Sequence, residues 1–185
     1  GSTRTQGLDI QSDYMFHLHQ YGTLTTTLAL NLNRTRVGHI NDNSQGQPYL
    51  NAQSIAYLTS TSPRSKIILN AYWTKANWDV NLRQTRYGET TSMLTYQDQA
   101  PAALQSSNTT WGQFKNTPVW LTDIEVGYRL DSNWHFAVGA NNVFNQRPRR
   151  LLKDLNYLVS NIYDTDSSGI GIAGGYYYGR INANF

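Results

Sequence analysis

The last twelve residues of the chain read GGYYYGRINANF, from Gly174 to Phe185. Taken in steps of two, they separate into an apolar or small set that ends on Phe185 and a polar set that ends on Asn184. Side chains of a β-strand alternate between its two faces, so this segment predicts a strand with one apolar face and one polar face. A membrane strand with lipid on one face and water on the other needs this alternation, with aromatic residues at the membrane–water interface. A soluble edge strand that ends by chance on an aromatic residue is the alternative.

Six further segments of the chain alternate between apolar and polar side chains in the same way. The connections between successive segments are alternately short and long. Outer-membrane barrels place short turns at one rim and long loops at the other. The sequence therefore predicts an all-β fold, an antiparallel transmembrane β-barrel fragment with seven strands at residues 3–17, 23–36, 66–74, 78–87, 118–130, 134–144 and 174–185.

The three long connections are predicted to be extracellular loops at residues 37–63, 88–117 and 145–173. Within the first of them, residues 50–58 predict one or two turns of helix. The phase of the alternation shifts by one at residues 141–144, which predicts a β-bulge. We expect residues 1–185 to belong to one outer-membrane β-barrel domain.

The composition excludes several classes of protein. The net charge is only +3 and the basic residues are scattered, so no arm for binding nucleic acid is present. The absence of cysteine excludes a disulfide framework and a thiolate metal site. With 13 tyrosines and 5 tryptophans the chain is too aromatic for a disordered protein. No apolar run is long enough for a transmembrane helix.

Seven strands do not make a complete membrane barrel. A sheet in lipid must close, because unpaired backbone groups are costly there, and single-chain bacterial barrels have an even number of strands. An eight-stranded barrel with one unrecognised strand is possible, but its narrow interior would be filled by side chains. Small and charged inward residues favour a wider lumen. We therefore expect a fragment of a larger barrel, with the plug and earlier strands absent.

Four stretches resemble the C-terminal third of TonB-dependent outer-membrane receptors. The most specific is Gly-x-Asn-Asn-x-Phe-Asn, which starts at Gly139 and is followed by Pro148. The resemblance implies a barrel of about 22 strands, of which this chain would be the last seven, with an N-terminal plug and a TonB box outside it. The stretches are TQGLDI at 5–10, WLTDIEVGYRL at 120–130, VGANNVFNQRP at 138–148 and GGYYYGR at 174–180.

This resemblance implies a transporter of the bacterial outer membrane, and neither an enzyme nor a protein with a cofactor. Its function would be TonB-dependent uptake of a scarce nutrient, with a ferric siderophore as the first expectation. The implied partners are TonB, the protein's own plug, the barrel-assembly machinery, outer-membrane lipid, lipopolysaccharide and a small-molecule metal chelate, with no nucleic acid. Two alternatives remain open: a smaller outer-membrane barrel acting as a pore or adhesin, and a soluble carbohydrate-binding β-sandwich.

Three groups of residues are candidates for function. Charges of both signs on the polar face predict a lumen that contacts the plug or is simply solvated: Asp123, Glu125, Arg129, Arg180 and Arg83. Basic and aromatic residues in the loops suit an oxygen-rich anionic ligand, or alternatively lipopolysaccharide: Arg147, Arg149, Arg150, Tyr96, Trp111 and Tyr157. The resemblance implies a barrel-assembly signal at Tyr177, Ile181 and Phe185.

No catalytic or metal-binding set is predicted. The pair His17 and His19 shares one strand face, but metal sites need three or four ligands. No Gly-x-Ser-x-Gly nucleophile motif is present. The Gly-rich segment 169–175 lacks the Lys and Ser or Thr of a phosphate-binding loop.

Overall fold

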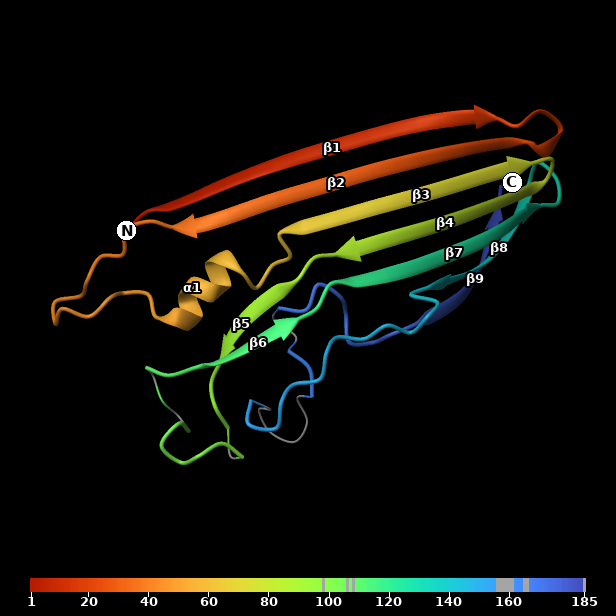
Figure 1. Cartoon of the computed structure of the whole chain (residues 1–185). Helices are drawn as coiled ribbons and strands as arrows, with labels where there is room; N and C mark the ends of the chain where they lie inside the picture. Colours follow the sequence, from red (N-terminus) through yellow and green to blue (C-terminus); the bar gives the residue numbers. More distant parts are fainter. Residues whose placement is uncertain (98, 106, 108, 156–161, 165–166, 185) are drawn as a thin grey trace.

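The computed structural model describes residues 1–97, 99–105, 107, 109–155, 162–164 and 167–184. Seven strands form one antiparallel sheet in the order β1-β2-β3-β4-β7-β8-β9 (Figure 1). Their bounds are β1 Thr3–His17, β2 Thr23–Val37, β3 Ser65–Lys75, β4 Trp78–Tyr87, β7 Val119–Arg129, β8 Trp134–Asn141 and β9 Tyr176–Ala183. The prediction of an all-β antiparallel fold with seven strands is confirmed.

The sheet curls so that β8 and β9 lie behind β7, but it does not close (Figure 1). Each strand pairs with its neighbour in the sheet order, and the edge strands β1 and β9 pair on one side only among the described residues. An open arc of this kind is what a fragment of a barrel wall would form, since lipid-facing sheets must otherwise be closed.

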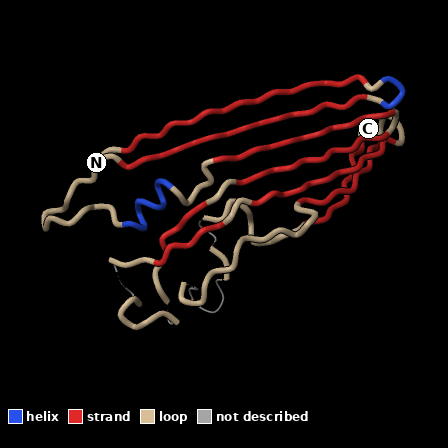
Figure 2. The backbone as a smooth tube through the Cα atoms, viewed as in Figure 1, coloured by secondary structure: helices blue, strands red, loops and turns tan. Residues whose placement is uncertain are grey.

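Short and long connections lie at opposite ends of the sheet (Figure 2). The short turns gather at one end, where residues His19–Tyr21 form the 3-10 helix η1. The backbone N–H of Asn184 donates to the carbonyl of Asn133 at 2.9 Å, so the described C-terminal end lies beside a short turn. The long connections gather at the other end. This segregation confirms the loop pattern that the sequence predicted.

The long connections contain regular structure of their own. The first contains helix α1, Ala52–Thr59, whose N-terminus is capped by the Asn51 side chain accepting from the Ser54 N–H at 2.8 Å. This helix confirms the expectation for residues 50–58. The second contains a hairpin that the sequence analysis missed, formed by β5, Thr90–Leu94, and β6, Gly112–Asn116.

The predicted β-bulge at residues 141–144 is wrong. Strand β8 ends at Asn141, and Asn142 has a positive φ of 51°. The Asn142 side-chain oxygen accepts from the Gln146 N–H at 2.8 Å, and its amide donates to the Gln146 carbonyl at 2.7 Å. Asn tolerates the left-handed region and bonds to nearby backbone, so this segment is a turn. The shift in phase marked the end of a strand.

The two faces of the seven-stranded sheet differ in chemistry. One, called here the apolar face, aligns Leu28 with Leu69 and Leu82 with Ile124. Large apolar side chains on this face stay exposed; Leu28 is 43% and Ile124 37% exposed. A β-sandwich would bury such a face under a second sheet. The opposite face, which carries Asp123 and the other strand carboxylates, is called here the polar face.

Most of the buried apolar residues in the described part of the chain lie among the loops, and the exceptions are two small residues of β8, Ala137 and Ala140. Phe114 in β6 is 1% exposed, Leu155 is 3% exposed and Ile170 is 7% exposed. A methyl group added to Gly112 would lie 2.2 Å from a Leu155 methyl carbon, so these two residues already pack in close contact. The second and third long connections therefore form one packed unit at the loop end of the sheet.

Candidate functional site

On the polar face, side chains of two strands bond to each other over the strand that lies between them. The contact is made at a glycine of that middle strand. Asp79 of β4 and His135 of β8 lie on either side of β7, and the Asp79 Oδ1 to His135 Nε2 distance is 2.7 Å. They meet above Gly127, where an added Cβ would lie 2.4 Å from Asp79 Oδ2 and 2.5 Å from His135 Nε2. Glycine at this position leaves the space that both side chains occupy.

A second contact of the same kind joins β7 and β9. Glu125, Gly139 and Tyr178 lie side by side in three neighbouring strands. The Tyr178 hydroxyl passes over Gly139 and donates to Glu125 Oε2 at 2.8 Å. Arg180 Nη2 donates to the other oxygen, Oε1, at 2.6 Å. The Glu125 carboxylate therefore connects β7 to β9 across β8.

All five predicted lumen residues lie on the polar face by strand register. Glu125 and Arg180 form an ion pair. Asp123 lies opposite Arg83 and accepts from the backbone N–H of Asn142 at 2.7 Å. Arg129 lies opposite His135 and its side chain is exposed. The face thus presents both signs of charge, and Glu125 is bonded to Arg180 of another strand, whereas Asp123 is bonded to the turn after β8.

The three predicted loop arginines have different surroundings. The Arg149 guanidinium lies 5.4 Å from the centre of the Phe114 ring and its Nη1 donates to the Lys115 carbonyl at 3.3 Å. Arg150 pairs by its backbone with Tyr163. A hydrogen bond from Arg147, assisted by one from Arg150, lowers the pKa of the Tyr163 phenol below its ordinary value. Arg149 is therefore held against Phe114 and the backbone of β6, whereas Arg147 and Arg150 both interact with the Tyr163 phenol.

A cavity of about 210 Å³ lies where the second and third long connections meet the end of β4. Arg147 and Arg149 line one part of it, and Tyr87 and Gly88 line another. Lys66 lies next to it on the sheet, with its Nζ 5.2 Å from the centre of the Tyr87 ring. The cavity therefore has cationic side chains near it and no Asp or Glu in its lining.

Two of the predicted aromatic loop residues, Tyr96 and Trp111, do not line this cavity. Tyr96 is partly buried and bridges by its backbone to Gln105, and Trp111 is partly buried directly before β6. Tyr157 lies outside the described residues. Of the predicted assembly residues, Tyr177 and Ile181 lie on the apolar face of β9, 68% and 64% exposed, whereas Phe185 lies outside the described residues.

A buried carboxylate that the sequence analysis did not single out fastens the third connection to the β5–β6 hairpin. Asp164 is 4% exposed and accepts from the Ser92 hydroxyl at 2.5 Å and from the Ser167 hydroxyl. Ser167 also accepts from the Asn116 amide at 3.1 Å, and its carbonyl accepts from Thr90. No spacing in the sequence indicates this cluster, because its members come from three separated segments.

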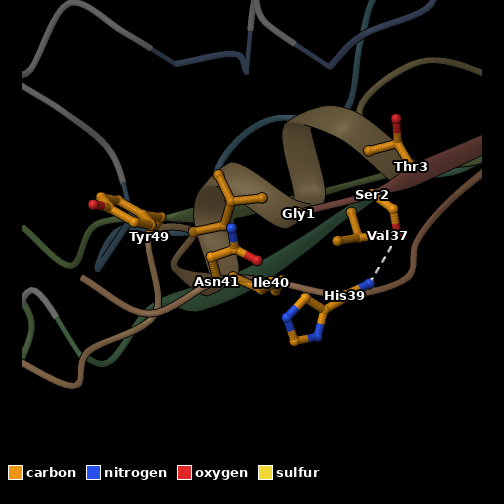
Figure 3. A pocket seen from close by; sticks show the side chains of 9 residues that line it. Gly1, Ser2, Thr3, Val37, His39, Ile40, Asn41 and Tyr49 are labelled. Atoms are coloured by element: carbon orange, nitrogen blue, oxygen red, sulfur yellow. Dashed lines mark hydrogen bonds between the residues drawn. The ribbon is translucent and has the colours of Figure 1, made fainter. Parts of the chain in front are cut away.

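A second cavity, also about 210 Å³, lies beside the first residues of the chain (Figure 3). Residues 1–3 line it together with the loop that follows β2, and the backbone N–H of His39 donates to the Ser2 hydroxyl at 3.1 Å. Its lining holds no acidic side chain. Within the described ranges, no three His, Cys, Asp or Glu residues are placed to hold a metal ion. No described helix is long and apolar enough to cross a membrane.

Comparison with protein sequences adds no relative. No model of a protein family matches this sequence. No curated protein matches it with significance. Likeness to known proteins is therefore found in the three-dimensional fold.

Solved structures of outer-membrane receptors match nearly the whole chain. The pyoverdine outer membrane receptor FpvA of Pseudomonas aeruginosa aligns over 99% of this chain with a TM-score of 0.58 and 16% identity. The ferric enterobactin receptor PfeA of the same organism aligns over 95% with a TM-score of 0.53 and 16% identity. The copper transporter OprC aligns over 99% with a TM-score of 0.54 and 13% identity.

The chain spans only a fraction of these structures, 22% of FpvA, 22% of PfeA and 24% of OprC. At this level of identity the likeness concerns the fold, and the residues that bind ligands in those proteins are not carried over. The order of the strands, the open arc and the segregated loops all agree with a section of such a barrel. The chain has the fold of part of the β-barrel of TonB-dependent outer-membrane receptors.

Proposed function

We propose that this chain is the C-terminal part of the barrel of a TonB-dependent receptor that takes up a ferric siderophore across the bacterial outer membrane. The observation that carries the proposal is the difference between the two faces of an open sheet with this fold. The apolar face leaves Leu82, Ile124 and Val138 exposed, at 40%, 37% and 66%. Water would penalise such a surface, whereas hydrocarbon would not.

The domain assignment follows from this proposal. Residues 1–185 contribute seven strands to one barrel, and the long connections at 37–63, 88–117 and 145–173 face the cell exterior. The short turns face the periplasm. Tyr177 and Ile181 of β9, with Phe185, carry the signal that the barrel-assembly machinery reads.

The polar face would surround a plug domain contributed by another part of the protein. Two amide oxygens on this face, Oδ1 of Asn70 and Oδ1 of Asn81, are buried without a hydrogen-bond partner in the described residues. Buried polar groups are normally satisfied, so these two amides would have to turn outward for a plug or water to supply the donors. The plug in turn would present the TonB box to TonB, which transmits energy for transport.

The cavity beside Arg147 is the proposed first contact for the chelate. Arg suits oxygen-rich anions because its planar guanidinium donates two parallel hydrogen bonds. Arg147 lines the cavity and bonds to the phenol of the partly buried Tyr163, whereas Arg149 is held against Phe114. We therefore assign ligand contact to Arg147 ahead of Arg149, with Arg150 beside it. Tyr96, Trp111 and Tyr157 remain proposals for stacking elsewhere in the loops.

A transport assay tests the function directly. A strain lacking the complete receptor is grown under iron limitation with single ferric siderophores, haem, cobalamin or copper as the supplied nutrient. We expect a growth defect with one ferric siderophore, restored by the intact gene. A defect with copper or cobalamin alone would refute the siderophore assignment while keeping the transporter, and a protein that fractionates without detergent would refute both.

Arg147→Gln in the restored strain tests the site. We expect at least about tenfold weaker binding of the anionic siderophore, because a charge-assisted bond is lost. Lys115→Gln is the matched control, since Lys115 is an exposed loop cation paired with Glu89 at 2.9 Å. Equal binding by both variants would remove Arg147 from the site.

A further inference from the structure

The third long connection folds back on itself, so that one arm carries the loop arginines and the other carries Tyr163. The Leu151 N–H donates to the Ile162 carbonyl at 2.8 Å, and Arg150 bridges Tyr163 in an antiparallel pair. Residues directly opposite each other in such a pair have their side chains close together. The backbone therefore places Tyr163 next to the arginines of the other arm.

The position of Tyr163 is fixed by the residues around it. Its neighbour Asp164 is buried and accepts from the Ser92 hydroxyl of β5 at 2.5 Å. The backbone is thus anchored to β5 on one side of Tyr163 and paired with Arg150 at Tyr163 itself. The Tyr163 side chain is only partly buried, and turning it to another rotamer breaks neither anchor.

Arg147 is placed by the two ends of the same connection. A Cβ added to Gly174 would lie 3.0 Å from Arg147 Nε, so this glycine leaves the space that the arginine side chain occupies. The Asn145 side-chain oxygen accepts from the Gly175 N–H at 3.0 Å and ties the two ends of the connection together. The Arg147 guanidinium therefore packs on Gly174 while it donates a hydrogen bond to the Tyr163 phenol.

The Tyr163 phenol takes up hydrogen-bond donors beside the cavity. Arg147 lines that cavity, whereas Tyr163 does not. Arg147 and Arg150 both donate to the phenol oxygen, and these bonds hold the pKa of Tyr163 below its ordinary value. A guanidinium bonds more strongly to an ionised oxygen than to a neutral one, because the charges attract as well. An anion in the cavity would therefore be a better acceptor for these donors than the phenol is.

We propose that Tyr163 is an internal competitor at the ligand site, whose phenol occupies donors of Arg147 and Arg150 until an anionic ligand displaces it. The proposal rests on the proposed function, because it takes the cavity beside Arg147 as the place where an anionic ferric chelate binds. Tyr163 is then a specificity-determining residue that the bound chelate does not contact. A neutral ligand offers the arginines no better acceptor than the phenol, so only an anion gains by the exchange.

Arginine-selective labelling tests the contact without any chelate. The complete receptor in detergent is treated with phenylglyoxal, and mass spectrometry of its peptides gives the rate of modification at each arginine. In Tyr163→Phe we expect Arg147 and Arg150 to react about three- to tenfold faster, because they lose a hydrogen-bond acceptor. The phenyl ring stays in place, so the variant keeps the shape of the loop.

Two controls accompany the labelling. Arg149 is an internal control, because its guanidinium is held against Phe114 and should react at the same rate in both proteins. Tyr49→Phe is the matched variant, since it removes the hydroxyl of an exposed tyrosine in the first long connection and should change none of these rates. The heat-dependent gel mobility of Tyr163→Phe should match wild type, because the Asp164 anchor remains.

Binding measurements test the competition. The probes are a ferric tris-catecholate, which is anionic, and inorganic phosphate, whose binding is measured by its protection of Arg147 against phenylglyoxal. We expect Tyr163→Phe to bind both anions about three- to tenfold more tightly than wild type, because they no longer have to displace the phenol. In the Arg147→Gln background the same replacement should have a smaller effect on tris-catecholate binding, since the two side chains contact each other.

Two outcomes would overturn the proposal. One is equal labelling of Arg147 and Arg150 in wild type and Tyr163→Phe. The other is unchanged or weaker binding of both anions by Tyr163→Phe, and weaker binding would make the phenol a ligand contact instead. If wild type binds no ferric chelate while phosphate protection changes as expected, the proposed function fails and this inference holds. If Arg147→Gln weakens chelate binding and Tyr163→Phe matches wild type, only this inference fails.

Discussion

Asp79 and His135 belong to strands that are not neighbours, yet the Asp79 carboxylate and the His135 ring meet at 2.7 Å above Gly127. The Asn182 amide lies 3.5 Å from the other ring nitrogen of His135. Glu125 and Tyr178 repeat the arrangement above Gly139. Because the intervening strand carries glycine, side chains of the two strands that flank it can bond to each other on the polar face.

Gly127→Ala should destabilise the barrel. The added Cβ would lie 2.4 Å from Asp79 Oδ2, so the Asp79–His135 contact must break or the sheet must shift. We expect a loss of about 1–3 kcal/mol, typical of overpacking. The effect is measured as the temperature at which the protein no longer migrates as the folded form on a gel. Gly179→Ala is the control, because no atom lies within 4 Å of its added Cβ. Equal shifts in both variants would contradict this role of Gly127.

Ile124→Asp should impair assembly far more than Asp123→Ala does. Ile124 lies on the apolar face, where a charge in hydrocarbon is costly, and we expect about 2 kcal/mol or more near the midplane. Asp123 lies on the polar face and accepts one backbone N–H, so its removal should be milder. The amount of folded protein in the outer membrane measures both. Similar losses would mean that the faces are assigned wrongly.

Asp164→Ala should release the third long connection from the hairpin without unfolding the barrel. The Ser92 and Ser167 hydroxyls would lose their common acceptor in a buried site, at a cost of about 1–3 kcal/mol. Limited proteolysis of intact cells should cut residues 145–173 faster than in wild type. Asp154→Ala is the control, since Asp154 lies in the same connection but outside this cluster. An unchanged rate of cutting would show that other contacts hold the loop.

Glu125→Gln should weaken the link between β7 and β9. The neutral amide loses the ion pair to Arg180 at 2.6 Å while keeping an oxygen for the Tyr178 hydroxyl. Because Arg180 is half exposed, we expect only about 0.2–1 kcal/mol. Chemical denaturation in detergent measures it, and Glu125→Ala should cost more because both bonds disappear. If Glu125→Gln were the more damaging variant, the ion pair would have to be the dominant contact.

Deletion of Phe185 tests the proposed assembly signal. We expect lower levels of the receptor in the outer membrane and accumulation of unfolded protein in the periplasm. Immunoblots of fractionated cells measure both, and Asn184→Ser on the opposite face of the terminal segment serves as the control. Normal membrane levels after deletion would remove Phe185 from the signal.

The sequence by itself determined the seven strands and their faces. Side chains of a strand alternate with a period of two, so Trp78, Leu82 and Ile124 could be assigned to one face without coordinates. Turn residues indicated where the short connections lie. Because short and long connections alternate along the chain, the sequence also predicted that all long loops lie at one end of the sheet and all short turns at the other. Strand β4 has the bounds that the pattern predicted.

Only the tertiary structure decided which distant residues share a site. The phase shift at Asn142 looked like a bulge in the sequence, but its side-chain bonds to Gln146 make it a turn. The Asp79–His135 contact depends on a glycine in a third strand, and the Asp164 cluster joins segments more than 70 residues apart in sequence. Such contacts depend on strand register and loop packing over long separations, and local periodicity carries no information about them.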